Sequence, residues 1–134
     1  MKPSFTHVAL SVQSIDASVA FYERFAGLGV VHDRSDGSRV VWLGEETAHP
    51  GFVLVLIEGA KPASAGPATL LHFGFDVPSR EDVDTIAGEA RTAGVLAAEP
   101  AFAGPIVGYF CMLQDPDGHW VEFSHGQTIG RHER

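Results

Sequence analysis

Two histidines and one glutamate have the residue types and positions of a metal site in this sequence. His7 and His72 each stand on the less apolar side of an alternating segment. Glu122 interrupts an apolar run, and a carboxylate in the middle of a strand is disfavoured unless it is paired or coordinated. Two neutral nitrogens and one anionic oxygen suit a divalent ion, and three protein ligands leave positions open for water, dioxygen or substrate. His7, His72 and Glu122 are therefore the predicted ligands of a catalytic metal.

The segments that position the two histidines repeat one another. Residues 6–12 and 71–77 both alternate between apolar side chains and small or polar ones, which predicts half-buried strands. His72 lies 65 positions after His7. This offset predicts that the chain consists of two similar halves.

A helix is predicted after each of these strands. Small hydroxyl side chains supply the first hydrogen bond of a helix, and glycine tolerates the positive φ of a helix end. The second helix also begins with a sequence that resembles a capping box. The first predicted helix covers residues 15–25, with Ser14 as its cap and a stop at Gly29. The second covers residues 83–92, with Ser79 and Asp82 before it and a stop at Gly94.

Three short apolar runs follow each helix, so each half reads strand, helix, strand, strand, strand. The runs are 30–33, 39–43 and 52–57 in the first half, and 95–98, 109–113 and 120–124 in the second, with hairpin turns at Asp36-Gly37 and Asp117-Gly118. We therefore predict an α+β fold of two βαβββ modules in a single domain, 1–134. Its predicted parts are module one 5–59, hinge 60–69, module two 70–125 and a polar tail 126–134.

The composition narrows the classes of partner. With 134 residues and a formal charge of -8, the chain repels phosphate backbones and anionic lipid surfaces. We therefore expect no nucleic-acid partner. We also expect no membrane partner, because no apolar run approaches the roughly twenty residues that span a bilayer. The protein is expected to be cytoplasmic. Cys111 stands in an apolar segment and is interpreted as a buried, inert thiol.

The paired modules and one late motif resemble the vicinal oxygen chelate superfamily, which includes glyoxalases, bleomycin resistance proteins and extradiol dioxygenases. The motif is Asp115-Pro116-Asp117-Gly118-His119-Trp120-Val121-Glu122-Phe123. The resemblance covers residues 5–125. It implies a cup-shaped mixed sheet, a homodimer, and a metal ion that chelates two neighbouring oxygens of a small-molecule substrate. His7, His72 and Glu122 match the ligand positions of the family.

The position of a fourth ligand separates the reactions that the resemblance implies. When the two halves are aligned at Gly51 and Gly118, Val55 is the residue equivalent to Glu122, and a valine side chain cannot bind metal. Glu58 has the opposite strand parity and would need a bulge to contribute. A glyoxalase-type proton transfer therefore lacks an evident second carboxylate.

The three-ligand pattern favours an extradiol-type ring-cleaving dioxygenase with Fe(II), although Zn, Ni, Mn and Co also suit the ligands. Tyr109 and His119 are weak candidates for catalytic proton transfer. Three alternatives stay open: a glyoxalase-like lyase or isomerase, a metal-free protein that sequesters a bleomycin-like drug, and a scaffold that binds a protein partner. A fosfomycin-type transferase loses support because Met112 stands where a tyrosine is expected.

Overall fold

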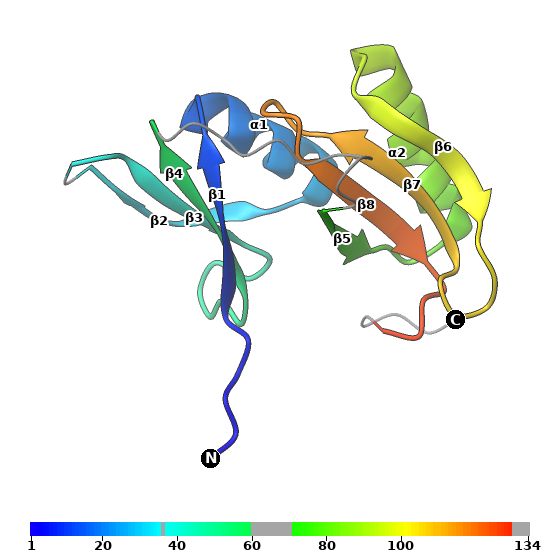
Figure 1. The fold of residues 1–134 in the computed structure, drawn as a ribbon, viewed down its shortest axis with the longest axis horizontal. Coiled ribbons are helices and arrows are strands. Elements are labelled where there is room, and N and C mark those ends of the chain that lie inside the picture. The colour runs from blue at the N-terminus through cyan, green and yellow to red at the C-terminus, as the bar shows by residue number, and fades with distance from the viewer. Residues whose placement is uncertain (36, 60–70, 130–134) are drawn as a thin grey trace. The chain divides into compact units, whose positions relative to one another are not determined.

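The computed structural model describes residues 1–35, 37–59 and 71–129 (Figure 1). The chain divides into two compact units, Met1–Ala63 and Ser64–Arg134, which are described separately below. The predicted hinge, 60–69, and part of the hairpin turn at Asp36 lie outside the described residues. Among the residues that are described, no helix is long and apolar enough to cross a membrane.

The first unit is a four-stranded mixed sheet with one helix. Its elements are β1 (His7–Val12), α1 (Ile15–Ala26), β2 (Gly29–Arg34), β3 (Val40–Gly44) and β4 (Val53–Glu58). The strand order is β1-β4-β3-β2, with β1 parallel to β4 and the other pairs antiparallel. α1 contacts β3 and β4.

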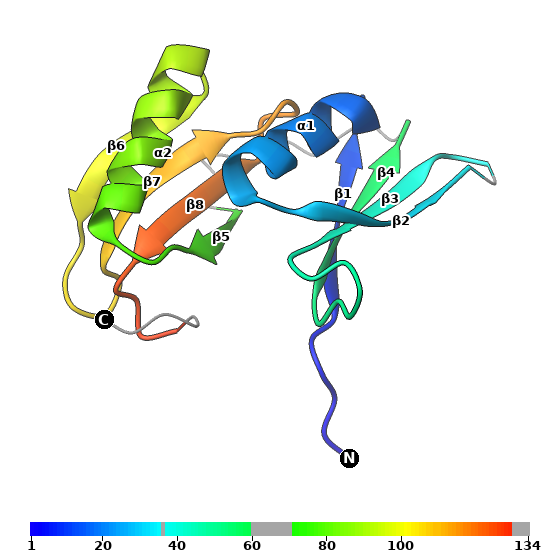
Figure 2. The same ribbon diagram turned by 180° about the vertical axis from the view of Figure 1, so that it is seen from behind.

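The second unit has the same topology. Its elements are β5 (His72–Asp76), α2 (Arg80–Ala93), β6 (Leu96–Phe102), β7 (Tyr109–Gln114) and β8 (Trp120–His125). The strand order is β5-β8-β7-β6, again with one parallel pair, β5 with β8. α2 packs on β6, β7 and β8, as the reverse view shows (Figure 2). The predicted α+β fold of two βαβββ modules is confirmed.

Serine begins both helices, as predicted. Ser14 accepts a hydrogen bond from the backbone N–H of Ala17 at 3.2 Å. Ser79 accepts one from the N–H of Asp82 at 3.1 Å and donates its hydroxyl to the Asp82 carboxylate at 2.8 Å. Each cap satisfies a backbone donor that the first turn leaves without a partner, a contribution of about 1 kcal/mol.

The end of α1 differs from the prediction. The helix stops before Gly27, which adopts φ 66°, and the prediction of a stop at Gly29 is wrong. Gly29 is the first residue of β2, where a Cβ would lie 2.7 Å from Cγ2 of Thr47. A side chain at position 29 would therefore require Thr47 to shift, whereas the left-handed cap is made two residues earlier. Gly94 ends α2 as predicted, with φ 75°.

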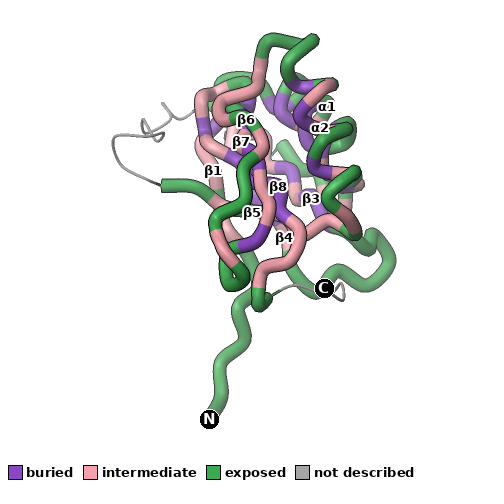
Figure 3. The backbone as a smooth tube through the Cα atoms, turned by 90° about the vertical axis from the view of Figure 1, so that its right-hand side faces the viewer, coloured by how far each residue is buried: buried purple, intermediate pink, exposed green. Residues whose placement is uncertain are grey.

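The strands of the second unit separate a core face from a polar face. Val121 and Phe123 of β8 are fully or almost fully buried with Cys111 of β7, whose Sγ lies 3.9 Å from the carbonyl oxygen of Val83 in α2. Figure 3 colours the buried stretches of the backbone purple, and β8 is among them. Burial raises the pKa of the Cys111 thiol to about 12, in agreement with the inert cysteine predicted. Burying one such large apolar side chain contributes roughly 1.5–3 kcal/mol. The intervening residues of β8 point to the other face.

β6 runs further than predicted, to Phe102, and includes Pro100. Proline cannot donate to a sheet ladder, so it is confined to edge strands and bulges. β6 is an edge strand of its sheet, and its register with β7 shifts between Ala98 and Ala101. Both conditions are met at Pro100, which explains why the strand does not end there.

Candidate metal centre

Glu122 occupies the middle of β8 on the face opposite the core. It pairs in register with Gly74 of the parallel strand β5. A Cβ on Gly74 would lie 3.2 Å from both Cβ and Oε2 of Glu122, which is tighter than ordinary contact. Gly74 thus leaves the room that the carboxylate occupies. Only 9% of Glu122 is exposed, so its charge is largely withdrawn from water and needs specific partners.

His72 lies on the same face and points to the same carboxylate. It stands two residues before Gly74 on β5, and its Nε2 is 3.8 Å from Oε1 of Glu122. Two metal–ligand bonds of about 2.1 Å that meet at roughly 90–110° place their ligand atoms about 3.0–3.4 Å apart. The observed separation exceeds this range by a fraction of an ångström. A closer approach of that size would bring this nitrogen and oxygen within the range of two ligands of one divalent ion.

Gln127 holds the second oxygen of the Glu122 carboxylate. Its side-chain nitrogen donates to Oε2 at 2.8 Å. The oxygen nearer to His72 is the other one, Oε1. Gln127 therefore orients the carboxylate so that one oxygen is hydrogen-bonded within the protein and one faces the imidazole, as outer-shell partners of metal ligands commonly do.

His7 belongs to the first unit, where it begins β1. Its side chain is exposed, and Nδ1 lies 3.0 Å from the hydroxyl oxygen of Thr6. It borders a cavity of about 480 Å³ that is lined mostly by apolar side chains of the first sheet. The structure thus brings two predicted ligands together, His72 and Glu122, within the second unit. The convergence of His7 with this pair stays a prediction.

Val55 takes the equivalent position in the first unit. It pairs with Ala9, two residues after His7, just as Glu122 pairs with Gly74, two residues after His72. Val55 lines the cavity together with His7. The alignment that set Val55 opposite Glu122 therefore agrees with the strand registers.

Glu58 is turned away from this cavity, as its strand parity predicts. Its Oε2 accepts a hydrogen bond of 2.8 Å from the backbone N–H of Ile15, the first residue of α1. The register of β4 with both neighbouring strands is regular over the described pairs, so no bulge redirects the side chain. A carboxylate at a helix N-terminus is favourable for α1, and this role occupies Glu58.

Tyr109, one of the two weak catalytic candidates, lies on the helix side of its sheet. Its hydroxyl donates to Oδ1 of Asp84 in α2 at 2.5 Å, and this bond raises the pKa of the phenol. The guanidinium of Arg80 lies 5.0 Å from the ring centroid. Met112 of β7 pairs with Glu122, so their side chains share one face of the sheet. Tyr109 lies an odd number of residues before Met112, and its side chain therefore points to the face opposite Glu122.

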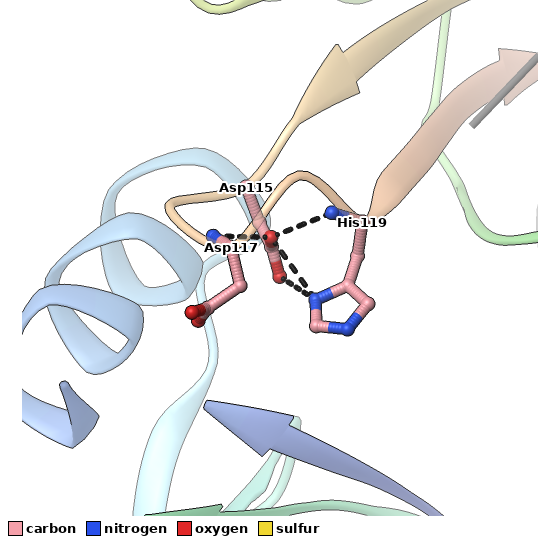
Figure 4. A group of neighbouring side chains, drawn as sticks. All are labelled: Asp115, Asp117 and His119. Atoms are coloured by element: carbon pink, nitrogen blue, oxygen red, sulfur yellow. Dashed lines mark hydrogen bonds and ion pairs between the residues drawn. The ribbon is translucent and has the colours of Figure 1, made fainter. Parts of the chain in front are cut away.

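His119, the other candidate, belongs to the turn between β7 and β8 (Figure 4). Its Nδ1 is 2.9 Å from Oδ2 of Asp115, and this hydrogen bond raises the pKa of His119. Oδ1 of Asp115 also accepts the backbone N–H groups of Asp117 and His119, each at 2.9 Å. Asp115 thereby closes the turn that the Asp117-Gly118 pair predicts.

One ligand atom from each of Asp115, Asp117 and His119 lies within 4.8 Å of the others. The group has the donors of a cation site. Its hydrogen bonds, however, already account for the turn geometry, because Asp115 accepts from two backbone groups and from the imidazole.

Two residues described above, Gln127 beside Glu122 and Arg34 at the cavity, were not predicted from the sequence. Gln127 falls in the segment interpreted as a polar tail, and no periodicity links it to Glu122. Arg34 lines the cavity of the first unit, at the end of β2. Its position on the same face as Trp42 was available from strand alternation once the pairing of β2 with β3 was known.

Comparisons with known proteins agree with this architecture. The family model described as "Glyoxalase/Bleomycin resistance protein/Dioxygenase superfamily" matches residues 4–123. A Pseudomonas aeruginosa protein described as "Uncharacterized protein PA2024" is 43% identical over 131 residues, which cover 97% of this chain and 94% of the relative.

Two solved structures are similar in fold. A possible glyoxalase from Bacillus cereus has 25% sequence identity and a TM-score of 0.72, with coverage of 90% of this chain and 97% of that one. A mutant of the fosfomycin resistance protein FosX from Listeria monocytogenes, complexed with Mn(II) and a dihydroxypropylphosphonic acid, has 18% identity and a TM-score of 0.76. The coverage is 96% of this chain and 95% of that one.

Proposed function

The chain belongs to the Glyoxalase/Bleomycin resistance protein/Dioxygenase superfamily, and from this premise we propose that it is a divalent-metal-dependent enzyme with His7, His72 and Glu122 as ligands. Its substrate is a small molecule that presents two neighbouring oxygen atoms. The observation that carries the proposal is the 3.8 Å approach of the His72 nitrogen to a buried carboxylate oxygen of Glu122. Buried carboxylates are retained where they are paired or coordinate a metal.

The ligand set defines what the ion contributes. Held by the imidazoles of His7 and His72 and the carboxylate of Glu122, a divalent ion would supply Lewis-acid chemistry. Around it, Gln127 keeps the Glu122 carboxylate oriented and Gly74 leaves space for it. Fe(II) is the ion we place first, and Mn, Zn, Co and Ni also suit these donors.

Extradiol-type ring cleavage is the reaction we place first. A glyoxalase-type isomerase or lyase needs a base that reaches a carbon-bound hydrogen of the substrate. Val55 provides no carboxylate at the position equivalent to Glu122, and Glu58 is engaged by the N-terminus of α1. Lyase chemistry is the second candidate, which the likeness to the possible Bacillus cereus glyoxalase supports.

Metal content measured by plasma mass spectrometry tests the proposal. The protein is purified without tag or chelator and compared with His7→Ala, His72→Ala and Glu122→Ala, and with His49→Ala as a control in an exposed loop. We expect about one equivalent of metal per chain in the wild type and the control, and its loss in the three ligand variants. Iron then directs oxygen-uptake assays with catechols, and nickel or zinc directs assays with thiol adducts of ketoaldehydes.

The contrary result is equally informative. Wild-type protein that binds none of the five ions, even after reconstitution, would refute the metal-dependent mechanism and favour sequestration of a small molecule without metal.

We further propose that the enzyme acts as a cytoplasmic homodimer. Sedimentation equilibrium tests the assembly, and a monomer at micromolar concentration would contradict it.

A further inference from the structure

The cavity of the first unit lies against a strand that is apolar on both sides. β4 reads Val-Leu-Val-Leu-Ile from Val53 to Ile57. Leu54 and Leu56 are buried in the core with α1, which contacts β4. Val53, Val55 and Ile57 alternate with them and line the cavity. Because a continuous apolar sequence is typical of strands that are covered on both faces, the face turned to the cavity is expected to be covered as well.

The neighbouring strands complete an apolar wall around Val55. Its register partners are Ala9 of β1 and Trp42 of β3, and both line the cavity. Among the described residues that line the cavity, none carries a carboxylate or an amide side chain. The second unit has the carboxylate of Glu122 at the position equivalent to Val55. The first unit therefore presents an apolar surface where the second unit presents a proposed metal ligand.

Trp42 gives this wall a flat aromatic surface that is held in place. The centroid of the His32 ring lies 4.9 Å from that of Trp42. The guanidinium carbon of Arg34 lies 6.0 Å from the Trp42 centroid, and Nη1 of Arg34 is 3.0 Å from Nε2 of His32. Arg34 is thus engaged within the protein, and the surface left for a ligand is the apolar wall. An indole that is oriented before binding loses little freedom when a ligand packs on it.

The volume of the cavity sets the size of the ligand. Its volume of about 480 Å³ is roughly three times the volume, about 150 Å³, of an apolar cavity that accommodates benzene. Sites for small organic ligands span about 300–1,000 Å³. A single ring would leave much of the wall uncovered and would forfeit dispersion contacts with it. A ligand of about two fused rings fits the space better.

We propose that this cavity binds the uncharged aromatic part of the substrate, a body of about two fused rings that packs against Trp42 and Val55. Aromatic rings bury a large apolar area and stack on other aromatic rings. The ring system carries no charged substituent, because a charge in an apolar site loses its hydration without gaining a partner. His7 begins β1 and borders the cavity, so the two neighbouring oxygens are expected at that end. The inference names the substrate class of the proposed enzyme and rests on that function.

Binding of 2-naphthol and phenol to the metal-free protein tests the inference. The two probes carry the same hydroxyl group, are uncharged at neutral pH and differ by one fused ring. Nitrogen–proton NMR titration follows the indole signals of Trp42 and Trp120, with assignment by Trp42→Phe. Because the second ring removes four more carbon atoms from water, 2-naphthol should bind at least about tenfold more tightly than phenol. The Trp42 signal should shift on binding.

Two pairs of variants separate binding in the cavity from nonspecific adsorption. Ala9→Leu fills part of the cavity with an apolar side chain, and Ala20→Leu adds the same side chain at an exposed position of α1. Since overpacking is destabilising, the first should weaken 2-naphthol binding at least about fivefold, and the second should leave it unchanged. Val53→Thr places a hydroxyl group in the wall and should also weaken binding. Val30→Thr makes the same change at an exposed position of β2 outside the cavity and should not.

The melting temperatures of the metal-free variants verify that each is folded. Equal affinity for the two probes, a shift confined to Trp120, or a 2-naphthol affinity that neither Ala9→Leu nor Val53→Thr lowers would overturn the inference. Because the protein carries no metal in this experiment, the outcome is independent of the metal measurement. A protein that binds 2-naphthol in the expected pattern but binds no metal would refute the proposed enzyme and keep the aromatic site. A protein that binds metal but not 2-naphthol would keep the enzyme and overturn the aromatic site.

Discussion

Replacing Gln127 with alanine should weaken metal binding without unfolding the protein. The substitution removes the 2.8 Å hydrogen bond to Oε2 of Glu122 and leaves His72 and Glu122 in place. A hydrogen bond to a charged group contributes about 1.5–3 kcal/mol. Since about 1.4 kcal/mol corresponds to a tenfold change in affinity, the dissociation constant should rise about ten- to hundredfold. Loss of other outer-shell partners has effects of this size.

Competition against a chromogenic chelator measures this change. Zinc serves as the redox-inert probe ion, and Gln13→Ala in the first unit is the control for loss of an exposed amide. The melting temperatures of the metal-free proteins report whether Gln127→Ala is folded. A folded Gln127→Ala protein with a dissociation constant within about twofold of the wild type would refute the orienting role of Gln127.

Three further predictions concern stability and reactivity. The hydrogen bond with Asp115 raises the pKa of His119 in the folded protein. Protonated His119 therefore stabilises the fold fully below the pKa of about 6.5 that it has in the unfolded chain, and this stabilisation is lost as pH rises through its pKa in the folded protein. The melting-temperature gap between wild type and His119→Asn should therefore narrow on alkalisation, and a constant gap would contradict this. Cys111, with a pKa of about 12, should react with Ellman's reagent only after guanidinium unfolding; rapid native labelling would count against its burial. Ser79→Ala should lower the free energy of unfolding in urea by about 1 kcal/mol, and an unchanged midpoint would exclude the cap as a stabilising element.

The strands were predictable because alternation alone defines two faces. His72, Gly74 and Glu122 were assigned to one face from the sequence, and the register of β5 with β8 agrees. The same rule assigned Val55 and Glu58 to opposite sides. The alternation of side chains between two faces depends only on position along the strand, so it can be assigned without knowing the tertiary structure.

Features that depend on tertiary packing were less accessible. The sequence offers glycines at both 27 and 29, and only the pairing of Gly29 with Gly44 of β3 shows that the second one belongs to β2. Pro100 is a strand breaker by type, yet its place on an edge strand makes it tolerable. Gln127 reaches Glu122 from beyond the last strand, and such a contact has no sequence periodicity.

The pairing of Gly74 with Glu122, and of Ala9 with Val55, has a consequence for the number of metal ligands. The substitution Val55→Glu would add a carboxylate as a fourth ligand to the three proposed. A Cβ at position 74 would come within 3.2 Å of the Glu122 side chain, and Ala9 already carries a Cβ at the corresponding place. A glutamate at position 55 would lie beside that methyl group. Ala9→Gly would give a glutamate at position 55 the space beside it that Gly74 gives Glu122, so the two substitutions together would copy the arrangement of the second unit in the first.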